Sequence, residues 1–291
     1  MHDVLVISGT GFIGRAVVDA LERQGRAVVT TGRGTGRVCD VGDADAVDHL
    51  LAAVRPRGVV VCAGAPHDGP ARDLYRVHVS GTLNALESVA RHCPEAVVVL
   101  LGSAAEYGRV EPARLPIRED EPCRPIGLYG TSKLAQTQLA HAAAAAWGLR
   151  VRTARLFNVV GPGMPARYFF PALAERIRTA PAGSTIPLRD GAATRDFVHV
   201  ADVADALGLL LDPTVPDGIY NVSTGIETTV AAAAAVLGRL AGGIDATPEG
   251  GLNAPLRSAG DASRLRRLGW SPSHTWREAL ADVWRDSARA A

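Results

Sequence analysis

The feature that most constrains the fold is a regular alternation between short apolar runs and stretches of helical periodicity. The apolar runs are rich in β-branched residues and bounded by glycine or polar residues, which is typical of strands buried on both faces of a parallel sheet. They occupy residues 4–8, 27–31, 59–62, 96–101 and 151–156. Helical periodicity occupies residues 13–24, 44–54, 74–92 and 132–147. Repeated strand–helix units predict an α/β fold with a doubly wound parallel sheet.

The charge balance limits the kinds of partner. The chain has 291 residues, of which 31 are basic and 30 are acidic, so its formal net charge is +1. Such a chain creates no net field that attracts nucleic acid or an anionic membrane, and we expect neither as a partner. An anionic ligand must therefore be held by local groups.

The cysteines and the N-terminus indicate the compartment. The four cysteines, Cys39, Cys62, Cys93 and Cys123, are scattered without the spacing of a disulfide framework or a zinc site, so we expect no metal and a reducing environment. The apolar run at residues 4–7 is too short for a signal peptide or a membrane span. These features predict a cytoplasmic protein.

A glycine-rich motif follows the first apolar run. Gly9, Gly11 and Gly14, with Phe12 and Ile13 between them, form a GxGxxG pattern where the first strand should turn into the first helix. Glycines there permit a tight turn and let backbone amides approach a pyrophosphate. A plain glycine-rich turn is the alternative, but the flanking strand and helix favour a dinucleotide site.

The end of the second predicted strand bears on which dinucleotide binds. Thr31 is followed by Gly32 and Arg33, and no carboxylate comes before Asp40. A carboxylate there would bind the ribose 2′-hydroxyl of NAD, whereas a guanidinium suits a 2′-phosphate. We therefore expect NADP(H) to be preferred, with NAD(H) still possible if Arg33 is a solvated loop residue or only stacks on adenine.

The chain contains a single lysine beside thirty arginines, and its position is informative. Lys133 lies four residues after Tyr129, so on a helix the two side chains share a face. An ammonium beside a phenol lowers the pKa of the phenol and makes it usable in proton transfer. The alternative is a surface pair at the start of a helix.

Ser103 follows another predicted strand directly. Because the carboxyl ends of strands in an open parallel sheet face the ligand crevice, Ser103 is expected to hydrogen-bond a substrate oxygen. A serine that merely caps a turn is the alternative.

Several motifs in this order resemble those of the extended short-chain dehydrogenases/reductases, the NAD-dependent epimerase/dehydratase family that acts on nucleotide sugars. Besides the three already described, they lie at residues 155–163, 195–203, 220–223 and 261–272. The resemblance covers nearly the whole chain. It implies a Rossmann-type doubly wound sheet over residues 1–157 and 197–225, with a smaller, interleaved C-terminal substrate-binding cap over residues 158–196 and 226–291.

The resemblance also assigns roles to residues. It makes Ser103, Tyr129 and Lys133 the catalytic triad, with the last two also binding the cofactor. It places the following residues at cofactor-binding positions: Gly9, Gly11, Phe12, Ile13, Gly14, Arg33, Asp40, Val41, Ala63 and Gly64. It places Ser103, Ala104, Asn158 and Arg195 beside the nucleotide sugar. Asn158 could instead order a turn, and Arg195 could form a structural ion pair with Asp196 or Glu175.

The sequence departs from the family pattern at three places. His78 stands where the family usually has Asn, and we expect a satisfied buried histidine rather than a new base. Ala104 and Ala105 replace the acidic pair that the 4,6-dehydratases use, which argues against a dehydratase. The segment around Arg257 is shorter than usual, so Arg257 is a doubtful substrate contact.

The function expected from these features is reduction of an NDP-4-keto-6-deoxyhexose by hydride transfer from NAD(P)H, with Tyr129 as the proton donor. Three alternatives stay open: an NDP-sugar 4-epimerase with retained NAD, a reductase of a non-sugar carbonyl, and a non-catalytic dinucleotide sensor. Helices at residues 74–92 and 132–147 resemble those of a dimer interface in the family, which predicts a homodimer.

Overall fold

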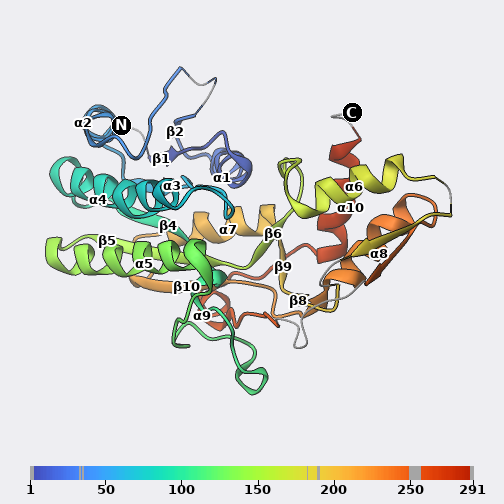
Figure 1. Ribbon diagram of the computed structural model, residues 1–291. Coiled ribbons are helices and arrows are strands. Elements are labelled where there is room, and N and C mark those ends of the chain that lie inside the picture. Colours follow the sequence, from blue (N-terminus) through green and yellow to red (C-terminus); the bar gives the residue numbers. More distant parts are fainter. Residues whose placement is uncertain are drawn as a thin grey trace.

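A computed structural model of the protein describes residues 3–32, 34, 36–181, 183–188, 191–248 and 257–288. Its centre is a six-stranded parallel sheet with the strand order β10-β5-β4-β3-β1-β2 (Figure 1). The strands are β1 (Val4–Ile7), β2 (Val28–Thr30), β3 (Gly58–Val61), β4 (Val97–Ser103), β5 (Arg150–Leu156) and β10 (Gly218–Val222). The order reverses direction between β1 and β3, so the predicted doubly wound fold is confirmed.

Helices cover both faces of this sheet, which explains why its strands are apolar without alternation. Val4 and Val6 of β1 join one core, while Leu5 and Ile7 join the other. One face is covered by α1 (Phe12–Arg23) and α7 (Val200–Leu210), and the other by α2 (Ala44–Val54), α4 (Gly81–His92) and α5 (Gly127–Trp147). None of the helices in the described ranges combines the length and the apolar content needed to cross a bilayer.

Two helix boundaries differ from those predicted. The helix expected over residues 74–92 begins earlier as α3 (Ala71–Tyr75) and passes through a π-helical turn (Arg76–Ser80) into α4. Helix α5 begins at Gly127, five residues before the predicted start, with a φ of +76° at that glycine. Glycine is a poor helix former, so Gly127 and Gly130 concealed the first turn from a periodicity analysis.

Most of the remaining elements lie together on the other side of the molecule from α2 and α4 (Figure 1). Three two-stranded pairs occur there: β6 (Asn158–Val160) with β9 (Phe197–His199), β8 (Thr194–Arg195) with β11 (Thr228–Thr229), and β7 (Thr185–Leu188) with β12 (Asp245–Pro248). The helices α6 (Phe169–Thr179), α8 (Val230–Leu240) and α10 (Trp276–Ser287) pack around a third core, and α9 (Ser263–Arg267) contacts β10. The division into a sheet domain and a substrate-binding cap at the stated boundaries stays a prediction.

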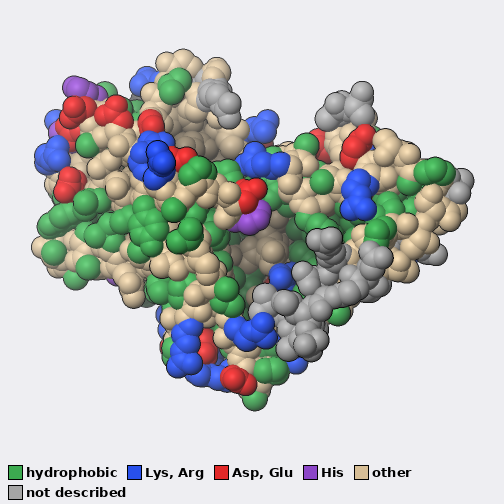
Figure 2. Space-filling model, viewed as in Figure 1, with side chains coloured by type: hydrophobic (Ala, Val, Ile, Leu, Met, Phe, Trp, Pro, Cys, Tyr) green, Lys and Arg blue, Asp and Glu red, His purple; other side chains and the backbone are tan. Residues whose placement is uncertain are grey.

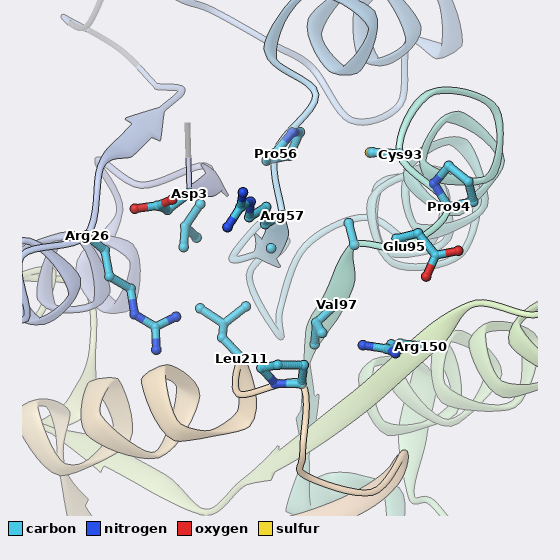
Figure 3. A pocket seen from close by; sticks show the side chains of 14 residues that line it. Asp3, Arg26, Pro56, Arg57, Cys93, Pro94, Glu95, Val97, Arg150 and Leu211 are labelled. Atoms are coloured by element: carbon cyan, nitrogen blue, oxygen red, sulfur yellow. The ribbon is translucent and has the colours of Figure 1, made fainter. Parts of the chain in front are cut away.

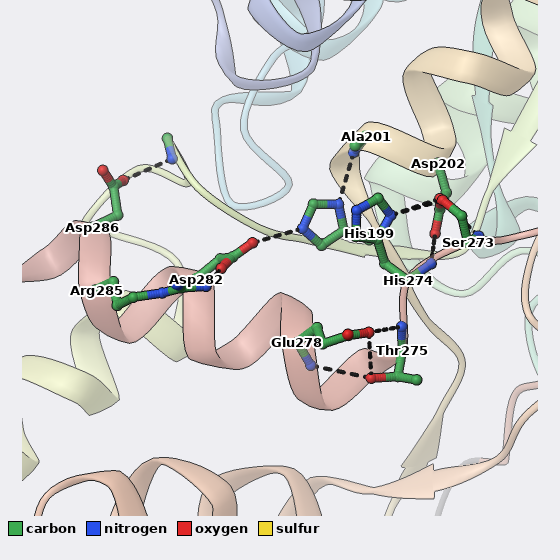
Figure 4. Close-up of polar contacts among 11 residues, drawn as sticks. His199, Ala201, Asp202, Ser273, His274, Thr275, Glu278, Asp282, Arg285 and Asp286 are labelled. Carbon is green, nitrogen blue, oxygen red and sulfur yellow. Dashed lines mark hydrogen bonds and ion pairs between the residues drawn. The ribbon is translucent and has the colours of Figure 1, made fainter.

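A polar network joins α10 to the start of α7 (Figure 4). Nδ1 of His199 accepts the Ala201 N–H at 3.0 Å, so Nε2 carries the ring hydrogen and donates to Asp282 at 3.1 Å. The ring stacks on His274 with 4.2 Å between centroids, and Nδ1 of His274 lies 2.9 Å from Asp202. These contacts fix α10 against the helix that packs on the sheet.

A buried arginine of β5 hydrogen-bonds the C-terminal end of α7. Arg152 of β5 is only 1% exposed. Its Nη1 donates to the carbonyl oxygens of Leu210 and, at 2.6 Å, Asp212, while its Nη2 donates to that of Val215. The guanidinium thereby supplies donors to the last carbonyl of α7 and to two carbonyls of the segment that follows it.

The substitution Arg152→Met should therefore destabilise the fold. It removes the guanidinium donor from the Leu210 and Val215 carbonyls, while the Asp212 carbonyl keeps the Val215 N–H, and we expect the free energy of unfolding to fall by about 3 kcal/mol. Urea denaturation measures this difference. Arg150→Met, on the same strand but half-exposed, is the control and should cost less than about 0.5 kcal/mol. Equal losses in the two variants would contradict the assigned role.

Candidate active site

The turn between β1 and α1 has the shape of an anion-binding site. Ser8 adopts a φ of +63°, and Gly11 precedes the first residue of α1, which has no side-chain cap and no acidic residue in its first turn. A side chain at Gly9 would overlap Thr30, and one at Gly14 would overlap the carbonyl of Ser8. The nearest neighbour to a side chain at Gly11 would be Ser8 O at 3.4 Å, an ordinary contact.

These glycines therefore have two different roles. Gly9 and Gly14 let the turn, β2 and α1 pack closely, while Gly11 leaves the helix N-terminus open to a ligand. The uncapped N–H groups and the helix dipole at this end fit a pyrophosphate. Gly163 of the β6–α6 loop lies against Phe12, and Asp286 of α10 accepts its N–H at 2.7 Å.

The segment after β2 contains Asp40 and Val41, two of the predicted cofactor-binding residues. Asp40 accepts from Arg76 at 2.7 Å and from the Gly42 N–H at 2.9 Å, and these bonds lower the pKa of its carboxyl group. Val41 is buried, and its carbonyl oxygen accepts from Asn84 at 2.8 Å. Arg76 is thus a neighbour of this position that the sequence did not reveal. Arg33, on which the NADP(H) preference rests, lies outside the described residues.

Ser103 and Tyr129 meet at the carboxyl end of β4. Burial raises the pKa of the Tyr129 phenol, and the polar Ser103 side chain beside it opposes this rise. Ser103 Oγ also accepts the Ala105 N–H at 3.2 Å, and Glu106 accepts the Ser103 N–H at 2.8 Å. Ser103 therefore caps the turn after β4 and also occupies the predicted substrate-binding position.

Lys133 is almost completely buried one helical turn beyond Tyr129. Its ammonium donates to the carbonyl of Leu101 at 3.0 Å and to the side chain of Gln136 at 3.0 Å. Burial lowers the pKa of Lys133 to about 8, partly offset by Glu106 and Cys62. The shift of the Tyr129 pKa has burial as its largest cause. The lowering of the Tyr129 pKa by Lys133 stays a prediction.

A buried ion pair supports the loop after β4. Glu106 is completely buried and accepts from Nε of Arg155 at 2.8 Å. The Arg155 guanidinium lies over the Tyr107 ring at 4.7 Å, and the Tyr107 hydroxyl donates to Asn221 at 2.7 Å. Glu106 thus fixes both Ser103 and Arg155. The sequence analysis missed this pair because its members are far apart in the chain.

Asn158 and Arg195, which were predicted to lie beside the nucleotide sugar, are on the short strands β6 and β8. Asn158 is exposed, and its backbone N–H donates to the Asp196 carbonyl at 3.0 Å. Arg195 is half-buried, and its Nη1 donates to the Thr194 carbonyl at 2.8 Å. The Asp196 carboxylate is completely buried and accepts from the following donors: the N–H groups of Thr224, Gly225 and Gly260 and the Thr224 hydroxyl. Arg257 pairs with Glu227.

The loop after β3 contains Ala63 and Gly64, the remaining predicted cofactor positions. The next residue, Ala65, donates its N–H to Nε2 of His78 at 3.1 Å. His78 is 1% exposed, and burial together with the Lys133 charge lowers its pKa to about 3. The expectation of a satisfied, neutral, buried histidine is confirmed.

A cavity of about 600 Å³ lies at the opposite edge of the sheet, where β1, β3, β4 and β5 begin (Figure 3). Arg26 and Arg57 project toward it from the loops before β2 and β3, and Arg150 projects toward it from the start of β5, while Leu211 and Val97 form part of its apolar wall. Ligands of open parallel sheets bind at the carboxyl ends of the strands. This cavity is therefore not part of the candidate active site. Within the described ranges we find no cluster of three or more metal-ligating side chains.

The comparisons with known proteins agree with this geometry. Residues 4–223 match the family model described as the NAD dependent epimerase/dehydratase family. The chain is 30% identical to the dTDP-6-deoxy-L-talose 4-dehydrogenase (NAD(P)(+)) of Kitasatospora kifunensis, with 99% of this chain and 96% of the relative covered. It is 31% identical to a UDP-glucose 4-epimerase of Azospirillum brasilense, with 93% and 87% covered. The structure of RMD from Pseudomonas aeruginosa complexed with NADPH superposes with a TM-score of 0.87 at 26% identity and covers both chains completely.

The chain therefore belongs to the NAD-dependent epimerase/dehydratase family. It is an NAD(P)-dependent enzyme of the extended short-chain dehydrogenase/reductase type, as the sequence motifs predicted. The turn at Gly9–Gly14 fits the dinucleotide that this family uses.

The single lysine permits a direct test of its environment. Because the chain has one lysine, protein labelled with ¹³C-lysine gives a single side-chain signal. We expect this signal to titrate near pH 8 in the folded protein and near 10.5 after denaturation. NMR titration measures both midpoints. A folded-state midpoint near 10.5 would show that the ammonium is solvated.

The same shift predicts how stability depends on pH. Between pH 8 and 10.5 the unfolded chain still binds the Lys133 proton that the folded chain has lost. The free energy of unfolding therefore rises with pH in this window, by about 3 kcal/mol at roughly 1.4 kcal/mol per pKa unit. Lys133→Met should remove this contribution, so its stability relative to the wild type should fall as pH rises. If the free energies of unfolding of the wild type and Lys133→Met changed in parallel between pH 8 and 10.5, the lowered pKa of Lys133 would be contradicted.

Proposed function

We propose that this protein reduces the keto group of an NDP-4-keto-6-deoxyhexose with NADPH. The observation that carries the proposal is that the Ser103 side chain at the end of β4 lies beside the Tyr129 phenol, one helical turn from the buried Lys133 ammonium. This group lies at the carboxyl edge of the sheet, the same edge as the open N-terminus of α1.

Each residue of the group has a role in carbonyl reduction. The bound dinucleotide supplies the hydride that the carbonyl carbon receives. Ser103 donates a hydrogen bond to the carbonyl oxygen, and Tyr129 transfers its proton to that oxygen as negative charge develops there. Lys133 stabilises the resulting phenolate, which regains a proton from water after product leaves. Ser103 and Ala104 adjoin the sugar, and Asn158 and Arg195 hold the diphosphate.

Two features support reduction with NADPH over the other reactions of the family. Residues 32–39 contain no carboxylate that could bind the ribose 2′-hydroxyl of NAD, and they include Arg33. Ala104 and Ala105 carry no acid for elimination of water. The Kitasatospora relative is a 4-dehydrogenase by name, and its name includes both NAD and NADP. NADP(H) is therefore the proposed cofactor, and NAD(H) remains the second choice.

A 4-epimerase is the second candidate, because the Azospirillum relative, at 31% identity, is a UDP-glucose 4-epimerase by name. An epimerase oxidises and then reduces the same carbon, so its dinucleotide returns to the starting state and stays bound. Purified protein that carries tight NAD and needs no added dinucleotide would favour this candidate. A reductase consumes one NADPH for each product molecule.

The proposed reaction is tested with a panel of TDP-, GDP- and UDP-4-keto sugars. We expect at least one of them to cause oxidation of NADPH, which is measured by the loss of absorbance at the nicotinamide wavelength. Tyr129→Phe should lower kcat by about 10²- to 10⁴-fold, because it removes the proton donor but keeps the ring. Tyr168→Phe serves as the control. It removes a phenol that lies close enough to influence the pKa of Tyr129 but has no role in the proposed reaction. A Tyr129→Phe variant with most of the wild-type turnover would refute the mechanism.

We also propose that the protein is a homodimer built on α4 and α5. Apolar side chains gather over these helices on the face shown in Figure 2. The outer side of α5 carries no charge at successive three- and four-residue spacings, and these positions are Leu128, Thr131, Ala135, Gln138, Ala142 and Ala145. An uncharged stripe of this kind is suited to a partner helix.

Light scattering should give the mass of two chains at working concentration. Ala142→Glu should shift the mass toward one chain, because it places a charge at an exposed position of the stripe. Ala53→Glu is the control, because it places the same charge at an exposed position of α2, outside the stripe, and should leave the mass unchanged. A monomeric wild type would refute the proposed dimer.

A further inference from the structure

His78 lies at the centre of the candidate active site without belonging to the predicted triad. It is in the π-helical turn between α3 and α4, and single turns of this kind are frequent at functional sites. The ring is 1% exposed and meets the Tyr129 ring edge-on, with 5.6 Å between the ring centroids. The turn therefore aims an imidazole at the side of the proposed proton donor.

A chain of three hydrogen bonds passes through His78. The Ala65 N–H donates to Nε2 at 3.1 Å, Nδ1 lies 2.9 Å from Ser132 Oγ, and Ser132 Oγ donates to the Tyr129 carbonyl at 2.8 Å. Both ends of this chain are backbone groups with fixed roles, since an N–H only donates and a carbonyl only accepts.

The fixed ends determine the protonation state of the ring. Nε2 must be an acceptor, because Ala65 donates to it. Ser132 uses its only hydrogen on Tyr129, so it must accept from Nδ1, which therefore carries the ring hydrogen. The imidazole is neutral, and a second ring proton would face the Ala65 N–H and the nearby Lys133 ammonium. His78 is unsuited to act as an acid or a base here.

The two ends of the chain belong to different parts of the site. Ala65 adjoins Ala63 and Gly64, the predicted cofactor loop after β3. Tyr129 lies in the first turn of α5, where Gly127 and Gly130 give little intrinsic helix stability. The only covalent connection between these parts runs through more than sixty residues of chain. Their relative position therefore depends on contacts such as those of His78.

We propose that His78 is a positioning residue that ties the first turn of α5, and with it the Tyr129 phenol, to the Ala63–Ala65 loop. This inference rests on the proposed role of Tyr129. The imidazole uses one acceptor and one donor on opposite sides, so an apolar residue of similar size cannot replace it. An asparagine amide has the same pair of functions and should replace it in part.

The test compares His78→Leu with His78→Asn. We expect His78→Leu to lower kcat by about 10- to 100-fold, since small displacements of a reacting group have effects of this size, and to change KM for the sugar much less. His78→Asn should recover kcat to within about threefold of the wild type. Ser132→Ala, which breaks the chain with a smaller change in packing, should lower kcat in the same direction.

A matched control is available on the same helix. His141 of α5 is also partly buried, and its Nε2 bonds Thr153 at 3.1 Å, two turns beyond Lys133. His141→Leu removes a buried histidine bond outside the site and should leave kcat unchanged.

Two measurements do not depend on the sugar. In His78→Leu the affinity for NADPH, followed by fluorescence, should fall severalfold, and the Ala65 amide should lose protection from hydrogen exchange. Both should be retained in His78→Asn. If no keto sugar of the panel is reduced, but His78→Leu still lowers the NADPH affinity and the protection of the Ala65 amide, the proposed reaction is refuted and the positioning role of His78 stands. Wild-type kcat, NADPH affinity and Ala65 protection in His78→Leu would refute the role of His78, as would equal losses of kcat in the Leu and Asn variants.

Discussion

The site depends on one buried charge, the ammonium of Lys133 against the carbonyl of Leu101 at the end of β4. Burial of a charge is costly, and here the cost is expressed as a pKa lowered to about 8. The sheet makes this position possible, because β4 is covered on both faces and Leu101 lies one residue past Leu100, where the pairing of β4 with β3 ends. Gln136 supplies a second acceptor from the next turn of α5. The group that costs stability is thus the one that the proposed chemistry requires.

The surrounding contacts place the other proposed catalytic groups relative to this charge. Glu106 holds the Ser103 backbone and the Arg155 side chain, while His78 and Ser132 reach the main chain of Tyr129. On the opposite side, the His199 network joins α10 to α7, and Asp286 holds the loop at Gly163 beside Phe12. Rigid elements therefore meet at the carboxyl edge of the sheet, where a reacting carbonyl must be held closely.

Local patterns in the sequence were sufficient to predict the sheet, and the catalytic roles of Ser103, Tyr129 and Lys133 stay a prediction. The apolar run at Val4–Ile7 predicted a strand buried on both faces, and the single lysine four residues after Tyr129 led to the candidate site. The predicted start of α5 was wrong, because Gly127 and Gly130 weaken the sequence signal of a helix that tertiary contacts stabilise. The Glu106–Arg155 pair and the Asp196 contact with Gly260 were not predictable, since each joins residues about fifty or more apart. Such partners become visible only when the strands are assembled.

The most direct test of the central claim follows the hydride itself. NADPH deuterated at C4 of the nicotinamide ring, in each of its two stereoisomers, is incubated with an active 4-keto sugar, and the product is examined by mass spectrometry and NMR. The account predicts that one stereoisomer transfers its deuterium to the former carbonyl carbon, with one NADP⁺ released for each product molecule. Product without deuterium from either stereoisomer, formed by enzyme that retains its dinucleotide, would contradict it.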